Sequence, residues 1–127
     1  MLSSTKTNTS DISHVEQKLS IQCRNFAEDS IAIRSLDWDR SRFDIEFGLR
    51  NGTTYNSFII KGKKIAVIDT SHSKFESLWL DNLIQHVDPK EISYLISSHT
   101  EPDHSGLISD LLDLNPEITI VLSLIHI

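Results

Sequence analysis

The sequence predicts an α/β fold, with a mixed β-sheet and helices packed on its outside. Strand-like apolar alternation fills much of the first half of the chain. The second half alternates strand and helix patterns, in the order strand, helix, strand, loop, helix, strand. A dense polar cluster follows one short apolar strand, at the sheet edge where such folds place their chemistry. The order of the elements and the position of this cluster carry the prediction.

Length, composition and charge restrict the class of protein. The chain has 127 residues, of which 39% are hydrophobic, and a formal net charge of −6. It suits one small domain or part of a larger one, and nucleic acid is disfavoured because no Lys and Arg cluster could meet phosphates. Cys23 is the one cysteine. We expect it as a small apolar filler in a strand, and a reducing, cytoplasmic compartment fits. No apolar run is long enough to span a membrane.

Strands are expected in the first half, after a disordered tail over residues 1–18 that opens with a Ser- and Thr-rich stretch. A first strand covers 21–26 and a second covers 31–36, with a turn between them. Residues 43–47 alternate Phe or Ile with Asp or Glu, which predicts a half-buried strand with an acidic outer face. The acidic residues here are interpreted as a solvated face rather than as ligands: Asp37, Asp39, Asp44 and Glu46.

A hairpin and a helix follow. The apolar runs 58–60 and 65–68 are joined through a Lys-Gly-Lys turn, and they are continuous enough to be covered on both faces. Residues 74–86 repeat apolar side chains at helical spacing, which predicts an amphipathic helix. Ser73 and Glu76 have the spacing of a capping box at its start.

The remaining elements complete the α/β pattern. Trp79 is expected in the core, on the apolar face of the first helix. A short buried strand is predicted over 92–97, then a helix over 107–114 that Asn and Pro end, and a further strand over 118–121.

The chemistry is expected in the loop after strand 92–97. Four candidate metal ligands occur there within six positions: His99, Glu101, Asp103 and His104. In an extended loop alternate side chains point the same way, so the first three can converge while His104 faces a neighbouring point. That arrangement suits two metal ions a few ångströms apart. Two imidazoles with two carboxylates suit iron or manganese at least as well as zinc, and a polar surface loop is the simpler alternative.

The loop carries the pattern His-x-Glu-x-Asp-His, which resembles the flavodiiron proteins of the metallo-β-lactamase superfamily. Hydrolases of that superfamily have His in place of Glu101. Four other stretches resemble the diflavin flavoproteins of oxygenic phototrophs: 35–40, 43–48, 51–57 and 69–72. The resemblance implies a metallo-β-lactamase-like αββα sandwich, of which residues 19–121 would form only the N-terminal half.

The same resemblance implies an oxidoreductase that passes electrons from NADH or NADPH through FMN to dioxygen, reducing it to water at a non-haem di-iron centre. Some members of the family reduce nitric oxide. His99 and Glu101 would hold one iron, and Asp103 and His104 the other. The implied cofactors are a pair of irons, FMN and a second flavin, and the implied partners are NAD(P)H, dioxygen and related flavodiiron subunits. The family also needs two more His and a bridging Asp, which would come from segments beyond these residues.

Other interpretations stay open. A zinc-dependent metallo-hydrolase of the same fold is disfavoured by Glu101, and a non-catalytic partner subunit by the intact ligand pattern. His72 could approach the site and Trp38 could shield a cofactor, but a turn and simple packing are the plainer roles. Residues 122–127 match a translated sequencing adapter, so we expect a non-native tail there. We also expect these 127 residues alone to be inactive.

Overall fold

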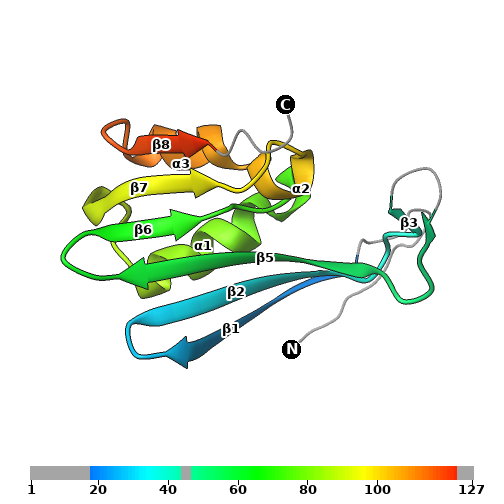
Figure 1. Cartoon of the computed structure of the whole chain (residues 1–127). Helices are drawn as coiled ribbons and strands as arrows, with labels where there is room; N and C mark the ends of the chain where they lie inside the picture. Colours follow the sequence, from blue (N-terminus) through cyan, green and yellow to red (C-terminus); the bar gives the residue numbers. More distant parts are fainter. Residues whose placement is uncertain (1–17, 44–46, 123–127) are drawn as a thin grey trace, which may run out of the picture.

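The computed structural model describes residues 18–43 and 47–122. Six strands form one mixed sheet in the order β1–β2–β5–β6–β7–β8 (Figure 1). Each pair from β1 to β6 is antiparallel, whereas β7 and β8 run parallel to β6. Their bounds are Leu19–Ala27 (β1), Ser30–Asp37 (β2), Thr53–Lys61 (β5), Ile65–Ile68 (β6), Ile92–Ser97 (β7) and Thr119–Leu122 (β8). The predicted α/β fold with a mixed sheet is confirmed.

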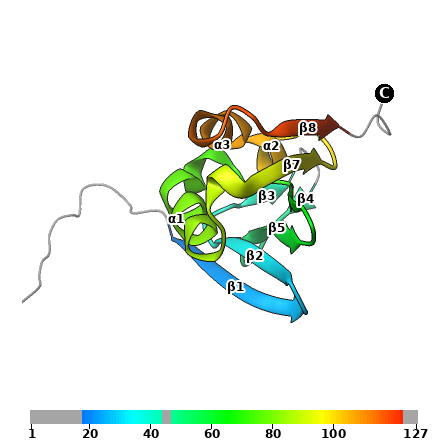
Figure 2. The same cartoon turned by 90° about the vertical axis from the view of Figure 1, so that its left-hand side faces the viewer.

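Helices cover one face of this sheet (Figure 2). Strands β6, β7 and β8 follow one another across the sheet in one direction, so right-handed crossovers place both connections on the same side. The helices are α1 (Glu76–His86), α2 (Pro102–Ser105) and α3 (Ile108–Leu114), with 3-10 turns η2 (Ser73–Phe75) and η3 (Pro89–Glu91). Among the described residues no helix is long and apolar enough to cross a membrane.

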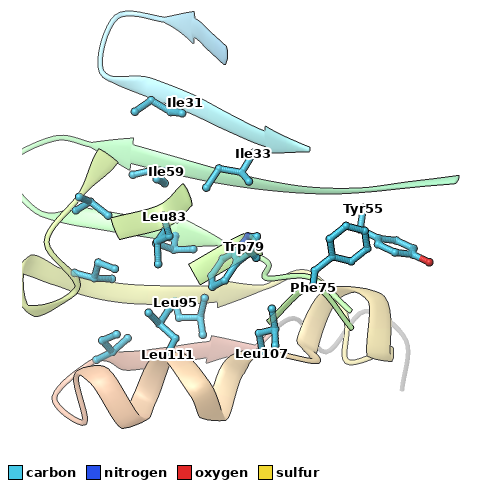
Figure 3. Close-up of a cluster of buried hydrophobic side chains, with 14 residues drawn as sticks. Ile31, Ile33, Tyr55, Ile59, Phe75, Trp79, Leu83, Leu95, Leu107 and Leu111 are labelled. Atoms are coloured by element: carbon cyan, nitrogen blue, oxygen red, sulfur yellow. The ribbon is translucent and has the colours of Figure 1, made fainter. Parts of the chain in front are cut away.

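The core lies between the helices and the sheet (Figure 3). Trp79 is fully buried there, as the sequence predicted. Its fully buried neighbours in the cluster include Ile33, Ile59, Leu83, Leu95, Leu107 and Leu111. Each such side chain contributes about 1.5–3 kcal/mol by leaving water. This packing makes the strands and helices a rigid support for the loops at the sheet edge.

The predicted strand over 43–47 is wrong. The structure has two short strands instead, β3 (Arg42–Phe43) and β4 (Phe47–Gly48), which pair with each other in a separate sheet. Phe43 lies opposite Phe47 in that antiparallel pair, so one strand cannot run through both. Alternation over so few residues is satisfied equally by the two arms of a hairpin, and this is why the pattern misled.

Two other predictions fall largely outside the described residues. The tail over 1–18 is described only at Lys18, and the tail over 122–127 only at Leu122. Leu122 ends β8, where it lies opposite Ser97 of β7. Asp44 and Glu46 also fall on residues that the structure does not describe.

The hairpin of β5 and β6 is confirmed, with Phe58 opposite Ile68. Its two faces differ among the described residues. Ile59 and Val67 are fully buried toward the helices, whereas Phe58 and Ile68 are half-buried on the other face. The apolar runs predicted that both faces of this hairpin are covered. Among the described residues, only the face toward the helices is.

The helix predicted over 74–86 is confirmed, but its start differs. The turn η2 precedes α1, and the capping group is His72 rather than Ser73. The His72 Nδ1 atom accepts a hydrogen bond from the Lys74 backbone N–H at 3.2 Å. An imidazole nitrogen thus performs the task that the capping-box spacing assigned to a hydroxyl, because the chain turns one residue earlier.

Cys23 has the packing role predicted for it. It lies half-buried in β1, where its Sγ donates to Asn82 Oδ1 on α1 at 3.3 Å. Burial raises the pKa of its thiol. The thiol therefore stays protonated near neutral pH.

Candidate metal centre

The candidate ligands lie at one edge of the sheet, where β6 and β7 both end. These strands are parallel, with Ile68 opposite Ile96, so the segments that follow them leave the sheet side by side. The segment after β7 carries His99 and Glu101 and then enters α2. The segment after β6 starts at Asp69, whose backbone N–H donates to Ile96 O at 2.8 Å.

The four candidate ligands form two pairs. His99 Nδ1 lies 3.0 Å from Glu101 Oε1, and His104 Nε2 lies 3.6 Å from Asp103 Oδ2. The His99 and His104 rings join the pairs, with centroids 3.9 Å apart. The Asp103 side chain is 8% exposed, whereas that of Glu101 is 61% exposed. The carboxylate of the Asp103–His104 pair is therefore buried, whereas the carboxylate of the His99–Glu101 pair is exposed to solvent.

The expected extended loop is wrong beyond Glu101. Residues Pro102–Ser105 form α2, so Asp103 and His104 occupy its first turn. Proline fixes the backbone angle that a helix needs at its first position. The backbone N–H groups of His104 and Ser105 both bond Glu101 O at 2.9 Å. The helical turn therefore places Asp103 differently from the extended loop, in which it was expected to converge with His99 and Glu101.

Asp69 supports His104, and the sequence analysis missed this role. The His104 Nδ1 atom lies 2.9 Å from Asp69 Oδ2, and the carboxylate also accepts from the Ser98 backbone N–H at 2.8 Å and the Ser98 hydroxyl at 2.6 Å. An ionised carboxylate accepts only, so the Nδ1 that faces Asp69 carries a proton, and Nε2 is the ring nitrogen that faces Asp103. This is the usual carboxylate–histidine support of a metal ligand. The sequence did contain a signal for this role, because Asp69 is a polar residue directly after β6, the parallel neighbour of β7.

The backbone of the same two segments is joined through Thr70. Its N–H and its hydroxyl both donate to His104 O at 2.8 Å, and Leu107 N–H donates to the Thr70 hydroxyl at 3.2 Å. Gly106 makes the close approach feasible, because a Cβ there would lie 2.7 Å from Ser71 O and 2.8 Å from Ser73 N. His104 is therefore held by both its ring and its carbonyl group.

Asp37 is not on a solvated face, and that interpretation is wrong. The residue is fully buried and its carboxylate bonds Lys74 Nζ at 2.6 Å and the Tyr55 hydroxyl at 2.7 Å. Burial raises the pKa of Asp37, but the Lys74 and Tyr55 hydrogen bonds and the Lys74 charge outweigh it, so the pKa lies below its ordinary value. Patterning misled here because an acidic residue inside a buried ion pair looks the same in sequence as one in water.

Tyr55 connects this carboxylate to other motif residues. Arg40 Nη1 donates to its hydroxyl at 2.9 Å, and the His72 ring stacks on its ring with centroids 6.1 Å apart. Burial raises the pKa of Tyr55 to about 12, with the Asp37 carboxylate adding to the shift. Burial, and then the charges of Lys74 and Arg40, lower the pKa of His72.

Three remaining residues have structural roles. His72 is half-buried with extended backbone just before η2, which it caps, so the surface turn expected for it is not found. Trp38 is 52% exposed, so the packing role predicted for it is wrong; its Nε1 donates to Ser20 Oγ at 3.2 Å. Asp39 is exposed, as predicted, and accepts from the Lys18 backbone N–H.

The donor set fits first-row transition metals, although it does not close a site by itself. Within the described ranges no group of three or more His, Cys, Asp or Glu side chains is arranged to hold a metal ion. The donors present are two imidazoles and two carboxylates in adjacent pairs, with the His104 tautomer fixed by Asp69. Mixed nitrogen and oxygen donors of this kind suit iron or manganese.

Comparison with known proteins points to one family. A family model described as "ODP family beta lactamase" matches residues 53–126. Diflavin flavoprotein A 1 of Synechocystis sp. is 60% identical over 106 residues, covering 84% of this chain and 18% of that protein. A flavo-diiron protein of Clostridium acetobutylicum is 43% identical over 81 residues, covering 64% of this chain and 20% of that protein.

Solved structures agree with this. A metal-soaked flavodiiron core from Synechocystis sp. is 36% identical with a TM-score of 0.73, covering 80% of this chain and 25% of that one. A flavo di-iron protein from Thermotoga maritima is 27% identical with a TM-score of 0.76, covering 81% of this chain and 27% of that one. The chain thus spans about a fifth of the length of the curated relatives that it matches. The chain belongs to the ODP family of β-lactamase-like proteins. It is homologous to the β-lactamase-like region of the diflavin flavoproteins and flavodiiron proteins.

Proposed function

We propose that this chain is part of a flavodiiron oxidoreductase that reduces dioxygen to water with electrons from NADH or NADPH. Its β-lactamase-like region would hold a non-haem di-iron centre, and FMN and a second flavin would be carried elsewhere in the protein. The family membership supports this, since relatives carry flavo-diiron names, and a solved relative from Desulfovibrio gigas is named rubredoxin oxygen:oxidoreductase. A cytoplasmic protein that assembles with related subunits completes the proposal.

One observation carries the proposal: the candidate ligands form two adjacent pairs with different shelter. His99 with Glu101 would hold one iron, and Asp103 with His104 the other. The ring contact between His99 and His104 brings the pairs together, at 3.9 Å between centroids. Ligands for two neighbouring ions need this adjacency, whereas a chance polar surface loop does not.

The chain's own residues would orient and tune such a centre. Bound iron would supply reversible one-electron chemistry. Asp69 accepts a hydrogen bond from His104 Nδ1, so Nε2 is the nitrogen that would face an iron ion. Buried Asp103 limits water on its side, while the more exposed Glu101 leaves the other side open to a small substrate. Dioxygen in particular needs no large pocket.

The test is metal analysis of the full-length protein, loaded anaerobically with ferrous iron. We expect two irons per chain, and NADH- or NADPH-dependent consumption of dioxygen. Bound zinc with hydrolase activity would favour the metallo-hydrolase, and a protein without metal would favour the non-catalytic partner subunit. Absence of bound iron from a folded protein with this loop intact would overturn the proposal.

The Asp69→Asn variant tests the support given to His104. Asn tolerates the positive φ of 58° at this position, so the backbone is expected to persist. Loss of the carboxylate that accepts from His104 Nδ1 should weaken iron binding about 10- to 100-fold. The matched control is Asp113→Asn, on the exposed side of α3, where iron affinity should not change. Equal affinities for the two variants would contradict the role of Asp69.

A further inference from the structure

We propose that Asp37 is a positioning residue for residues 98–104, named here the metal loop, and that it acts through the segment 69–74, which lies between them. The inference rests on the proposed function and concerns a group that the proposed ligand set does not use. Asp37, Tyr55 and Lys74 are named here the Asp37 cluster, and residues 69–74 the bridging segment. The cluster contacts the Lys74 end of this segment, and the Asp69 end contacts His104.

The cluster is strongly held because it is ionic and buried. The Asp37 side chain is 0% exposed and that of Lys74 is 22% exposed, with their charged atoms 2.6 Å apart. A buried charge is tolerated only when it is paired and hydrogen-bonded, so Asp37 fixes its partners in place. Tyr55 supplies the second hydrogen bond to the same oxygen at 2.7 Å.

Both partners of Asp37 also contact the bridging segment. Lys74 belongs to it, and its backbone N–H is bonded to His72 Nδ1 at 3.2 Å. The Tyr55 ring stacks on the His72 ring at an interplanar angle of 28°. The Asp37 carboxylate therefore determines where Lys74 and His72 lie.

Strand β2 holds the middle of the segment as well. The Ser71 hydroxyl donates to Ser35 Oγ at 2.8 Å, and both side chains are fully buried. Ser35 precedes Asp37 by two positions on β2, so both residues point to the same face of the sheet. The strand thus holds the bridging segment at two successive points.

The far end of the bridging segment holds the metal loop. Asp69 contacts the His104 ring at 2.9 Å, and Thr70 makes two hydrogen bonds of 2.8 Å to the His104 carbonyl oxygen. Gly106 packs against the Ser71 and Ser73 backbone without room for a Cβ. A displacement of the segment at Lys74 must therefore move the support of His104. The coupling runs through contiguous packed contacts.

The test uses the full-length protein and has two independent readouts. The first is hydrogen exchange of the Thr70 amide in the metal-free protein, which reports the contact to His104 directly. The second is the affinity for ferrous iron. The variants are Asp37→Asn, Tyr55→Phe, which removes only one hydroxyl, and the control Asp81→Asn, an exposed position on α1.

We expect Asp37→Asn to speed exchange at Thr70 at least about tenfold and to weaken iron binding by a similar factor. Tyr55→Phe should shift both in the same direction by less, and it keeps the inference testable if Asp37→Asn fails to fold. Asp81→Asn should change neither. Unchanged exchange and unchanged affinity in both cluster variants would overturn the inference.

The two proposals can fail separately. If the unmodified protein binds no iron but Asp37→Asn still speeds exchange at Thr70, the proposed function fails and the coupling stands. If the protein binds iron and exchange and affinity are the same in all variants, the function stands and the positioning role fails.

Discussion

A carboxylate outside the candidate ligand set, Asp69, determines how His104 is presented. It fixes the ring tautomer and also bonds Ser98 at two points, so it ties the start of the metal loop to its end. Asp37 performs a similar structural task farther from the loop, as the buried member of an ion pair with Lys74. Both carboxylates hold neighbouring residues in place, and neither belongs to the candidate ligand set.

The pH dependence of stability is expected to report the Asp37 ion pair. Its pKa is lower in the folded protein than its ordinary value of 3.8, because the hydrogen bonds from Lys74 and Tyr55 outweigh burial. A lowered folded pKa means that the unfolded chain binds the proton more readily. The stabilisation is therefore fully present above the ordinary pKa and is lost as the pH falls through the folded value.

The measurement is the free energy of urea unfolding of the unmodified protein and of Asp37→Asn. Near about pH 7 the unmodified protein should be the more stable, and the difference should shrink as the pH falls below 3.8 and Asp37 takes up its proton. Comparison with the variant cancels the titration of the other carboxylates. A difference that stays constant across this range would show that the ion pair does not stabilise the fold.

Pattern and residue type predicted the candidate ligands, but not their supports. His99, Glu101, Asp103 and His104 share one short stretch, so a local pattern contains them. Asp69 meets His104 only because β6 and β7 are parallel and in register, which no local pattern states. Buried Asp37 was misassigned for a related reason, since its partners Tyr55 and Lys74 come from distant parts of the chain.

The elements at the sheet edge are packed backbone to backbone, and Gly106 is one place where they approach closely. It joins α2 to α3, and a Cβ on it would approach the Pro102 carbonyl oxygen to 2.6 Å, besides the backbone of residues 71 and 73. All three obstacles are backbone atoms, which cannot rotate away as a side chain could. The junction of the helices therefore depends on a missing side chain.

Gly106→Ala is expected to destabilise the protein by about 1–3 kcal/mol or more, because backbone atoms must shift to admit the methyl group. Gly62→Ala is the control, since its Cβ would meet Lys64 O at an ordinary 3.6 Å. Urea unfolding of both variants gives the comparison. Equal losses would mean that the segments at the sheet edge separate readily, which would also weaken the case for a rigid bridging segment.

Helices and strands were predicted correctly where the apolar spacing repeats over many residues, and wrongly where it covers only a few. The helix over 74–86 was predictable because several turns of apolar spacing agree. The pair of short strands at 42–43 and 47–48 was not, because so few residues satisfy either arrangement. The turn from Pro102 was missed because a helix of one turn has too few positions to show a period.

The sheet topology brings the functional parts together. Asp37 ends β2 opposite Thr53, and β5 continues antiparallel to β6, so the start of β5 extends past the end of β6. Parallel β7 then delivers the metal loop to the same edge. The Asp37 cluster and the metal loop are thus neighbours because antiparallel strands and parallel strands meet within one sheet.

The rigidity of the sheet edge that carries the metal loop depends on the core below it. A substitution in α1 tests this dependence. Trp79 of α1 is fully buried in the cluster that also contains Ile33 of β2 and Leu95 of β7. Trp79→Ala should lower the free energy of unfolding by about 3–5 kcal/mol, since it removes the largest buried side chain and leaves a cavity.

The neighbouring position on the same helix gives the control. Leu78 is 37% exposed, so Leu78→Ala should change stability by no more than about 0.5 kcal/mol. Trp79→Phe separates volume from polarity, because the Trp79 Nε1 atom is buried without a hydrogen-bond partner among the described residues. Phe removes that unsatisfied donor and keeps most of the ring, so its loss should be well below that of Ala. Similar losses for Leu78→Ala and Trp79→Ala in urea unfolding would mean that α1 is not anchored through this core, and the rigid support of the metal loop would have to come from the sheet alone.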